Sequence, residues 1–537
     1  MEIINRAIER GKHISGNKEL DGQTWEDFEK CSERKKVILF GAGASLGCYF
    51  ERYGDRKSLE GVIDNDPGKQ GFSIGEFIPE AFGLRSGEKK ISDISLLHAY
   101  PPDEIVLLIT STNYYEAIIE QLRRAGVKNY FVLVILEANE KKPPDEGPEE
   151  SIDLRKTYFA KRCCVQEKVN RKKIFFKAFG DYADHGKYIT EALLKKRKDL
   201  DLVWSVNDMR AKVPDGVRKI YAGNWKRFIY EMETSGMWIL DLPVPPHIIK
   251  RPGQLYIQTK HWASITLKRF YLDASAFQTE PEKKKIWERE KDWIDHIITG
   301  SDFDTISCRR GFGFEGKVLQ YGSPRSDALF SGEKNRKKVY EYFALDKVKK
   351  ALLYAPTYRF DRAQGKKIHE SRNIELDFER LHTVLKRRFG GGWYLLVRLH
   401  PSVAHAFETV EKPDFVVDVS LYDDSQELVS ASDILVSDYS SIMFEAAFVD
   451  KPVFLYATDL QEYITKEYEL LIPYRELPFA VAESDEELER NILRWDPDLY
   501  RSRLESFLRK YGVCEDGHAS ERTAAFIINW IEEGGIE

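Results

Sequence analysis

The sequence predicts an α/β fold in which a smaller N-terminal Rossmann-like domain precedes two further Rossmann-like domains. Short apolar runs of strand length alternate with amphipathic helical stretches along the 537 residues, a pattern typical of parallel, doubly wound sheets. The clearest interruption is the charged, proline-rich segment "EANEKKPPDEGPEES" at 137–151, which has the composition of a linker. These two observations separate a first series of elements from a longer second part.

The elements are expected in three series. The first has strands at 36–40, 59–67 and 104–111 and helices at 48–54 and 114–126. The second has strands at 172–180, 201–208, 219–223, 237–241, 255–259 and 317–322 and a helix at 224–236. The third has strands at 351–359, 393–401, 415–420, 433–441 and 451–457, a helix at 441–450 and helical segments at 489–512 and 519–535.

The last two series are expected to face each other across a cleft, as in GT-B transferases. The predicted boundaries are 1–140 for the N-terminal domain, 141–151 for the linker, 152–335 for the second domain and 336–537 for the third domain with its C-terminal helices. Ligands of open α/β sheets bind at the carboxyl ends of the strands. Residues with suitable chemistry are therefore sought at those ends.

Composition excludes several classes of protein. A net charge of -6 argues against a broad nucleic-acid-binding face. The six cysteines are scattered, without the spacing of a zinc site or a disulfide framework, which fits a reducing cytoplasm. The N-terminus lacks the apolar core of a signal peptide. No apolar run reaches the roughly 18 residues of a spanning helix, so any membrane contact is expected to be peripheral.

The segment "DILVSDYSSIMFEAAFVDKPVFLY" at 433–456 has the most informative strand end. The strand ends at Asp438, and Ser440 and Ser441 can cap the following helix, whose free N–H groups and positive dipole suit a diphosphate. Glu445, one turn later, could bind the hydroxyls of a ribose. The alternative is an ordinary capped helix with Glu445 in solvent.

Other strand ends carry donors suited to phosphate oxygens. Each alone fits a structural role equally well, but their convergence favours a phosphate-rich ligand. These candidates are Ser323, Arg325 and Asp327 in "YGSPRSD", Thr357 and Arg359 in "YAPTYR", and Arg398 and His400 in "VRLHPS". Since no acidic pair stands at metal-ligand spacing, no metal is expected.

Residues 172–530 resemble the CDP-glycerol glycerophosphotransferase family, the teichoic acid polymerases and primases. The resemblance rests on "FFKAFGDYADHGKYITEALLKKRKDLDLVWSV", "YGSPRSD", "LLYAPTYR", "LHP", "SDILVSDYSSIMFEAAFVDKPVFLY" and "DGHASER". It implies a GT-B fold with an acceptor-side domain followed by a CDP-donor domain. It also implies transfer of glycerol phosphate or another polyol phosphate from a CDP-activated donor to a hydroxyl, with release of CMP and no cofactor beyond that donor.

The family's Gln-Thr-Trp-His-Gly motif is altered in this chain. Gln258 and Thr259 are followed by Lys260-His261-Trp262-Ala263, and Lys268 comes later than usual. Alignment from the left places His261 at the catalytic base, whereas alignment from the right places Trp262 there. His261 is favoured because tryptophan cannot accept a proton, with a packing role as the alternative.

In the implied reaction, His261 accepts the proton of the attacking hydroxyl. The other groups would stabilise the diphosphate and the departing CMP, as phosphoryl transfer requires. These are His400, Arg325, Arg359 and the helix start at Ser440–Ser441. Ser520 and Arg522 in "DGHASER" could close over the donor, or Ser520 could simply cap a helix.

The N-terminal domain leaves two interpretations open. "GAGASLG" contains Gly41, Gly43 and Gly47, one residue longer than the usual dinucleotide spacing, and Asp64 ends the next predicted strand. It resembles small Rossmann domains of nucleotide-sugar-handling proteins. Nucleotide binding and a docking role are weighed equally.

Three functions remain compatible with the sequence: a CDP-polyol phosphotransferase for teichoic acid or a capsule-type polymer, a GT-B glycosyltransferase using a nucleotide sugar, and a non-enzymatic binder. The expected partners are a CDP-activated polyol and a hydroxyl acceptor, lipid-linked or glycan, and no nucleic acid. A lipid-linked acceptor would place this otherwise cytoplasmic protein at the inner membrane face. Candidate contacts for that face are 224–230 and 268–272, although solvated helix faces are the simpler explanation.

Overall fold

A computed structural model provides the structure of the chain. It describes residues 18–140, 152–275, 281–357, 360–361, 366–367, 376–399, 407, 412–467 and 469–534. Spatial contacts divide the chain into two compact units. One comprises Met1–Phe175, Val203–Ser235 and His247–Pro252, and the other comprises Phe176–Leu202, Gly236–Pro246 and Gly253–Glu537.

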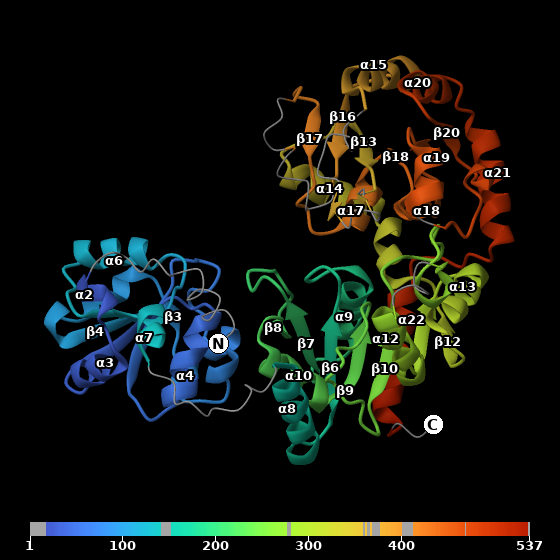
Figure 1. The fold of residues 1–537 in the computed structure, drawn as a ribbon. Coiled ribbons are helices and arrows are strands. Elements are labelled where there is room, and N and C mark those ends of the chain that lie inside the picture. Colours follow the sequence, from blue (N-terminus) through green and yellow to red (C-terminus); the bar gives the residue numbers. More distant parts are fainter. Residues whose placement is uncertain are drawn as a thin grey trace. The chain divides into compact units, whose positions relative to one another are not determined.

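The first sheet, in the blue and cyan part of Figure 1, is five-stranded and parallel, and its strand order is β3-β2-β1-β4-β5. Its strands are β1 (Lys36–Phe40), β2 (Leu59–Ile63), β3 (Ile91–Ser92), β4 (Ile105–Ile109) and β5 (Tyr130–Val132). Its helices are α2 (Lys18–Asp21), α3 (Trp25–Ser32), α4 (Gly47–Tyr53), α5 (Ile74–Phe77), α6 (Tyr115–Arg124) and α7 (Leu133–Asn139). One face packs on the apolar side of α6 through Ile118, Ile119 and Leu122.

The second sheet has seven strands in the order β12-β11-β10-β9-β6-β7-β8. They are β6 (Asn170–Lys177), β7 (Asp201–Val206), β8 (Val217–Tyr221), β9 (Ser235–Leu240), β10 (Leu255–Gln258), β11 (His296–Thr299) and β12 (Lys317–Gln320). The helices are α8 (Ile152–Gln166), α9 (Asp184–Lys196), α10 (Trp225–Thr234), α12 (Pro281–Trp293) and α13 (Asp302–Phe312). Because β9 to β12 run parallel, the loops after them meet at one edge.

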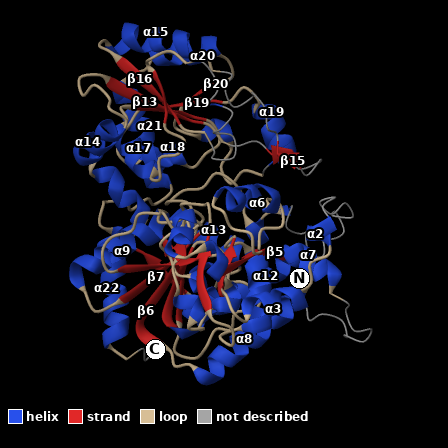
Figure 2. Ribbon diagram, turned by 90° about the vertical axis from the view of Figure 1, so that its left-hand side faces the viewer, coloured by secondary structure: helices blue, strands red, loops and turns tan. Residues whose placement is uncertain are grey.

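The third sheet has six strands in the order β17-β16-β13-β18-β19-β20. They are β13 (Lys350–Ala355), β16 (Trp393–Val397), β17 (Val416–Asp418), β18 (Ile434–Ser437), β19 (Val453–Tyr456) and β20 (Ala480–Ala482). Helices cover both faces, as Figure 2 shows for strands in red and helices in blue. They are α14 (Gly332–Tyr342), α15 (Phe378–Phe389), α17 (Ser425–Ala431), α18 (Ile442–Ala447), α19 (Leu460–Glu462), α20 (Asp485–Leu493) and α21 (Pro497–Lys510). The last helix, α22 (Ala519–Glu532), instead packs on α9 beside the second sheet. A two-stranded antiparallel sheet, β14 (Phe360–Asp361) and β15 (Lys366–Lys367), is separate.

Alternation along β13 shows how the third sheet divides its core. Leu352 and Tyr354 lie in one cluster with residues of α15 and α20. Ala351, Leu353 and Ala355 lie in another with residues of α14, α17, α18 and α21. Successive side chains of a strand point to opposite faces, so a strand covered on both faces is apolar throughout.

These observations confirm the predicted α/β fold with an N-terminal Rossmann-like sheet. Sequence analysis missed β11, because "HIIT" is only four residues long. The predicted domain boundaries remain a prediction. In the first unit, Asn224 Nδ2 donates to the Gly75 carbonyl at 2.6 Å, so residues on both sides of the predicted linker belong to one compact unit.

Candidate functional site

Four side chains lie at the carboxyl edge of the second sheet: His261 and Arg325, which the sequence predicted, and Asp184 and Asp241, which it did not. His261 lies in the loop after β10, Asp241 directly follows β9, and Arg325 lies in the 3₁₀ helix η7 (Pro324–Phe330) after β12. Asp184, the first residue of α9, follows β6. Parallel strands deliver these loops to the same edge, where α/β folds bind ligands.

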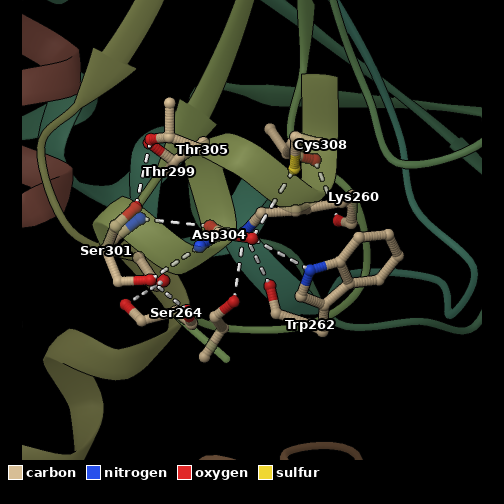
Figure 3. Close-up of polar contacts among 12 residues, drawn as sticks. Lys260, Trp262, Ser264, Thr299, Ser301, Asp304, Thr305 and Cys308 are labelled. Carbon is tan, nitrogen blue, oxygen red and sulfur yellow. Dashed lines mark hydrogen bonds and ion pairs between the residues drawn. The ribbon is translucent and has the colours of Figure 1, made fainter. Parts of the chain in front are cut away.

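A buried ion pair fixes the His261 loop to the start of α13 (Figure 3). Lys260 Nζ lies 3.1 Å from Asp304 Oδ2, and both side chains are fully buried. Trp262 Nε1 donates to Asp304 Oδ1 at 3.2 Å, and the Gly300 N–H donates to Oδ2 at the same distance. Lys260 itself has a φ of 57°, a rare value for a residue with a side chain. The carboxylate of Asp304 therefore holds both ends of this turn.

His261 and Trp262 have opposite environments. Trp262 is buried, donates to Asp304, and packs on Phe270 with ring centroids 4.4 Å apart. The His261 ring is exposed and lies 6.4 Å from the ring of Phe179 in a stacked arrangement. Of the two alternatives left by the sequence, the structure places His261 where a substrate can reach it.

The surroundings lower the pKa of His261 below the ordinary value of about 6.5. Loss of solvation in the dense protein around the ring is the main cause, and Arg325, Lys260 and Lys268 add to it, whereas Asp184 opposes it. Because the ring is exposed, we expect only partial loss of solvation. His261 is therefore neutral at pH 7 and able to accept a proton.

Arg325 makes three polar contacts. Its Nη1 donates to Asp184 Oδ2 at 2.6 Å and to the His261 carbonyl at 3.0 Å, and its Nη2 lies 3.1 Å from Glu445 Oε1. Glu445 is buried and also accepts from Gln426 Nε2 at 2.7 Å. Arg325 and Glu445, predicted to bind the diphosphate and the ribose, are thus placed as partners of each other.

The carboxyl end of the third sheet is organised by buried Asp438. Thr357 donates to it through its N–H at 2.8 Å and through Oγ1 at 2.6 Å. Ser440 and Ser441 precede α18, and Ser440 Oγ accepts a long bond of 3.4 Å from the Ile442 N–H. Neither hydroxyl makes a strong capping bond. The two serines, predicted to cap this helix, therefore remain partly exposed at its start, and their binding of a diphosphate stays a prediction.

Arg398 directly follows β16, at the same carboxyl edge of the third sheet. Its Nη1 donates to the backbone carbonyl of Tyr422 at 2.6 Å. It therefore supports the loop after β17. Arg359 and His400 lie outside the residues that the structure describes.

The remaining predicted residues connect the "YGSPRSD" segment to the C-terminus. The N–H of Ser323 donates to Glu515 Oε2 at 3.0 Å, and the N–H of Ser520 donates to Asp327 Oδ2 at 2.7 Å. Arg522 Nε donates to the Tyr321 carbonyl at 3.0 Å. Ser520 lies in the first turn of α22 and does not cap it, because the N–H groups of Ala519 and Ser520 both donate to the Asp327 carboxylate, which caps this helix start.

Lys268 lies on the other side of the His261 loop. Its ammonium is 5.5 Å from the centre of the Tyr463 ring. The adjacent Leu267 carbonyl accepts from the Leu471 N–H at 2.8 Å. The loop is therefore attached to the segment that follows α19.

The N-terminal glycine-rich loop is occupied by the protein's own groups. Asp64 accepts from the Ala42 N–H at 2.6 Å and from the Asp66 N–H at 2.8 Å. Gly41 has a φ of 113°, which only glycine adopts readily. A Cβ on Gly47, the first residue of α4, would collide with the carboxylate of Glu80, whereas Gly43 has open space around it. A carboxylate thus lies at the helix start where a bound phosphate would be expected.

Gly300→Ala is expected to lower the free energy of unfolding by about 1–3 kcal/mol. The added methyl would collide with Ser264 Oγ and lie 2.9 Å from Ser323 Oγ and 2.7 Å from Glu515 Oε1, all held in place by packing. Denaturant titration measures the change. Gly43→Ala is the matched control, since that glycine has an ordinary φ of -97° and free space. Equal midpoints for both variants would contradict the prediction.

Among the residues placed in the structure, no group of three or more His, Cys, Asp or Glu side chains could hold a metal ion. In the same part of the chain, no helix is long and apolar enough to cross a membrane.

Comparison with known proteins gives a consistent result. Residues 158–529 match the family model described as CDP-glycerol:poly(glycerophosphate) glycerophosphotransferase. The teichoic acid poly(glycerol phosphate) polymerase of Staphylococcus epidermidis is 27% identical over 383 residues, which cover 68% of this chain and 52% of that protein. The teichoic acid glycerol-phosphate transferase of Staphylococcus aureus is 28% identical over 374 residues, which cover 66% of this chain and 92% of that protein.

Comparison with solved structures points to the same family. The wall teichoic acid polymerase TagF, in a histidine-to-asparagine variant soaked with CDPG, is 26% identical and has a TM-score of 0.62. The similarity covers 71% of this chain and 95% of that one. This chain spans about half the length of the polymerases from S. epidermidis and Bacillus subtilis.

Proposed function

Because the chain belongs to the CDP-glycerol:poly(glycerophosphate) glycerophosphotransferase family, we propose that it transfers glycerol phosphate, or another polyol phosphate, from a CDP-activated donor to a hydroxyl acceptor. The observation that carries the proposal is the extent of the match. The matched segment, 158–529, contains every candidate residue except the four of the N-terminal domain, Gly41, Gly43, Gly47 and Asp64. Teichoic acid or a capsule-type polymer is the proposed product.

On the acceptor side, His261 is the proposed base. The acceptor oxygen attacks the β-phosphorus of the donor while the neutral imidazole takes the hydroxyl proton. The bond between that phosphorus and the bridging oxygen breaks, and CMP leaves with its electrons. The exposed ring of His261 and its lowered pKa support this role.

On the donor side, the proposed diphosphate ligands lie at the carboxyl edge of the third sheet. Ser440 and Ser441 supply hydroxyls at the positive end of the α18 dipole. Asp438 fixes the strand end through Thr357. Arg359 and His400 keep their predicted role of stabilising the charge of the departing CMP. Phosphoryl transfer depends on positioning and charge stabilisation, which are the roles proposed for these groups.

A lipid-linked acceptor at the inner face of the membrane is part of this proposal. The acceptors of polymer synthesis that carry hydroxyls are lipid-linked or glycan chains. The two basic, aromatic segments considered as membrane contacts direct their aromatic side chains into the protein. Phe228 is buried in α10, and Phe270 packs on Trp262. Membrane contact, if the acceptor requires it, is therefore assigned to other surfaces.

For the N-terminal domain we propose docking in preference to nucleotide binding. The carboxylate of Glu80 lies at the start of α4, and Asp64 is bonded to the loop that a nucleotide would contact. Within the first unit, Asn224 is buried and donates to the carbonyls of Gly75 and Glu76, and Phe77 packs on Tyr221 at 5.1 Å. These contacts support a domain attached through α5.

The test is a product assay combined with ligand-induced thermal shifts. We expect CDP-glycerol or CDP-ribitol to raise the melting temperature and to yield CMP when a polyol-phosphate acceptor is present. NAD is expected to give no shift, because the N-terminal loop is occupied. Release of a nucleoside diphosphate from a nucleotide sugar would instead favour a glycosyltransferase. Absence of turnover with every CDP-polyol would contradict the proposal.

A further inference from the structure

Asp184 has an unusual backbone conformation at the proposed active site. Its φ is 58°, the left-handed region that residues with side chains rarely adopt. Such strain persists where surrounding contacts fix it, and it concentrates at functional sites. Here Asp184 Oδ1 accepts from the His185 N–H at 2.7 Å, and Oδ2 accepts from Arg325 Nη1 at 2.6 Å. Sequence analysis did not select this residue.

Arg325 connects Asp184 to His261. The same Nη1 that binds Asp184 also donates to the His261 carbonyl at 3.0 Å, and Nη2 is paired with Glu445 at 3.1 Å. Only 11% of the Arg325 side chain is exposed. A guanidinium shared by two carboxylates and a carbonyl has little freedom to move, so it fixes the backbone that carries the imidazole.

We propose that Asp184 and Arg325 are positioning residues for His261. Arg325 holds the backbone of His261, and the Asp184 carboxylate stabilises the imidazolium that forms when the acceptor hydroxyl gives up its proton. This inference rests on the proposed function, in which His261 is the base. The proton stays on the imidazole, Asp184 gains none, and the bond electrons leave with CMP.

The charges near His261 make Asp184 the group that favours the protonated ring. The charged groups that act on the His261 ring are Asp184 in α9, Arg325 in η7, and Lys260 and Lys268 in the loop after β10. Asp184 is itself next to His185 and is affected by Asp241, which follows β9. Burial and the charge of Asp184 raise the pKa of Asp241, while Arg325 and other neighbours hold the pKa of Asp184 below its ordinary value. When two carboxyls are close, one keeps its proton, so Asp184 carries the negative charge.

The test is a titration of His261 in the full chain by histidine-selective NMR, with the resonance assigned from its loss in His261→Gln. The wild-type ring is expected to titrate below pH 6.5. Asp184→Asn keeps the backbone conformation, since asparagine tolerates it, but removes the charge. We expect the titration midpoint of His261 in Asp184→Asn to lie about 1 pH unit or more below the wild-type midpoint. Asp184→Glu, which restores the charge, is expected to return it toward the wild-type value.

Asp433→Asn is the matched control, because it removes a carboxylate that lies 3.0 Å from Arg336, at the opposite end of β18 from Asp438. A midpoint that is equal in wild type and Asp184→Asn would overturn the inference. Because the titration does not depend on turnover, failure of the positioning role can be distinguished from failure of the proposed function. A shifted midpoint in a protein that transfers nothing would overturn only the proposed function, whereas an unshifted midpoint in an active enzyme would overturn only the positioning role.

Discussion

His261→Ala is expected to reduce kcat for transfer from CDP-glycerol by about 10²–10⁴-fold, the usual contribution of a general base. The reason is that, among the described residues, no other exposed neutral side chain next to Arg325 can accept the proton. The other histidine at this site, His185, is fully buried. The measurement is CMP release at saturating donor and acceptor. The donor KM is expected to change little, since the base contacts the acceptor hydroxyl.

His98→Ala is the control for this experiment, because His98 is an exposed histidine on the first sheet domain. Wild-type turnover in His261→Ala would remove His261 from the reaction. The pH dependence gives a second check. The folded pKa of His261 is lowered, so the ring stays neutral below pH 6.5, and activity should persist there until the pH falls through that lowered pKa. An acid limb centred above pH 6.5 would contradict this assignment.

The sequence predicted the parts of the fold that depend on local pattern. Buried strands such as β1 and β13 are continuous apolar runs, and the residues after them lie at sheet edges because parallel strands end together. The same reasoning located the loops that carry His261, Arg325 and Ser440. It could not determine what those side chains contact. Arg325 has the expected place in the chain, but its charge is matched by Asp184 and Glu445.

The residues that sequence reasoning missed act through contacts between distant segments. Asp304 lies 44 positions after Lys260, and Glu515 is 251 positions from its partner Ser264. Nothing in the local pattern links such pairs, although each is an acid near the end of a strand or loop. Glu80 is a similar case, since its position over Gly47 depends on the packing of the 3₁₀ turn at Pro79–Ala81 against α4.

Lys260→Met is expected to lower the free energy of unfolding by about 3–5 kcal/mol, because it leaves the Asp304 carboxylate buried without a counter-charge. The pair is fully buried, and Asp304 also accepts from Trp262 and Gly300, so the carboxylate cannot turn toward water without breaking the loop. Chemical denaturation followed by tryptophan fluorescence measures the loss. Lys347→Met, which breaks an exposed pair with Glu341, is the control and should change little.

The double variant Lys260→Met/Asp304→Asn distinguishes the destabilisation caused by an unpaired buried charge from that caused by lost packing. Asparagine is neutral, so the penalty of an unpaired buried charge disappears, while its carbonyl can still accept from Trp262 Nε1. Most of the lost stability should therefore return. A double variant as unstable as Lys260→Met would mean that the lysine stabilises the loop by packing and not by charge. Because Lys260 directly precedes His261, transfer activity should recover only as far as the turn regains the conformation that presents the imidazole.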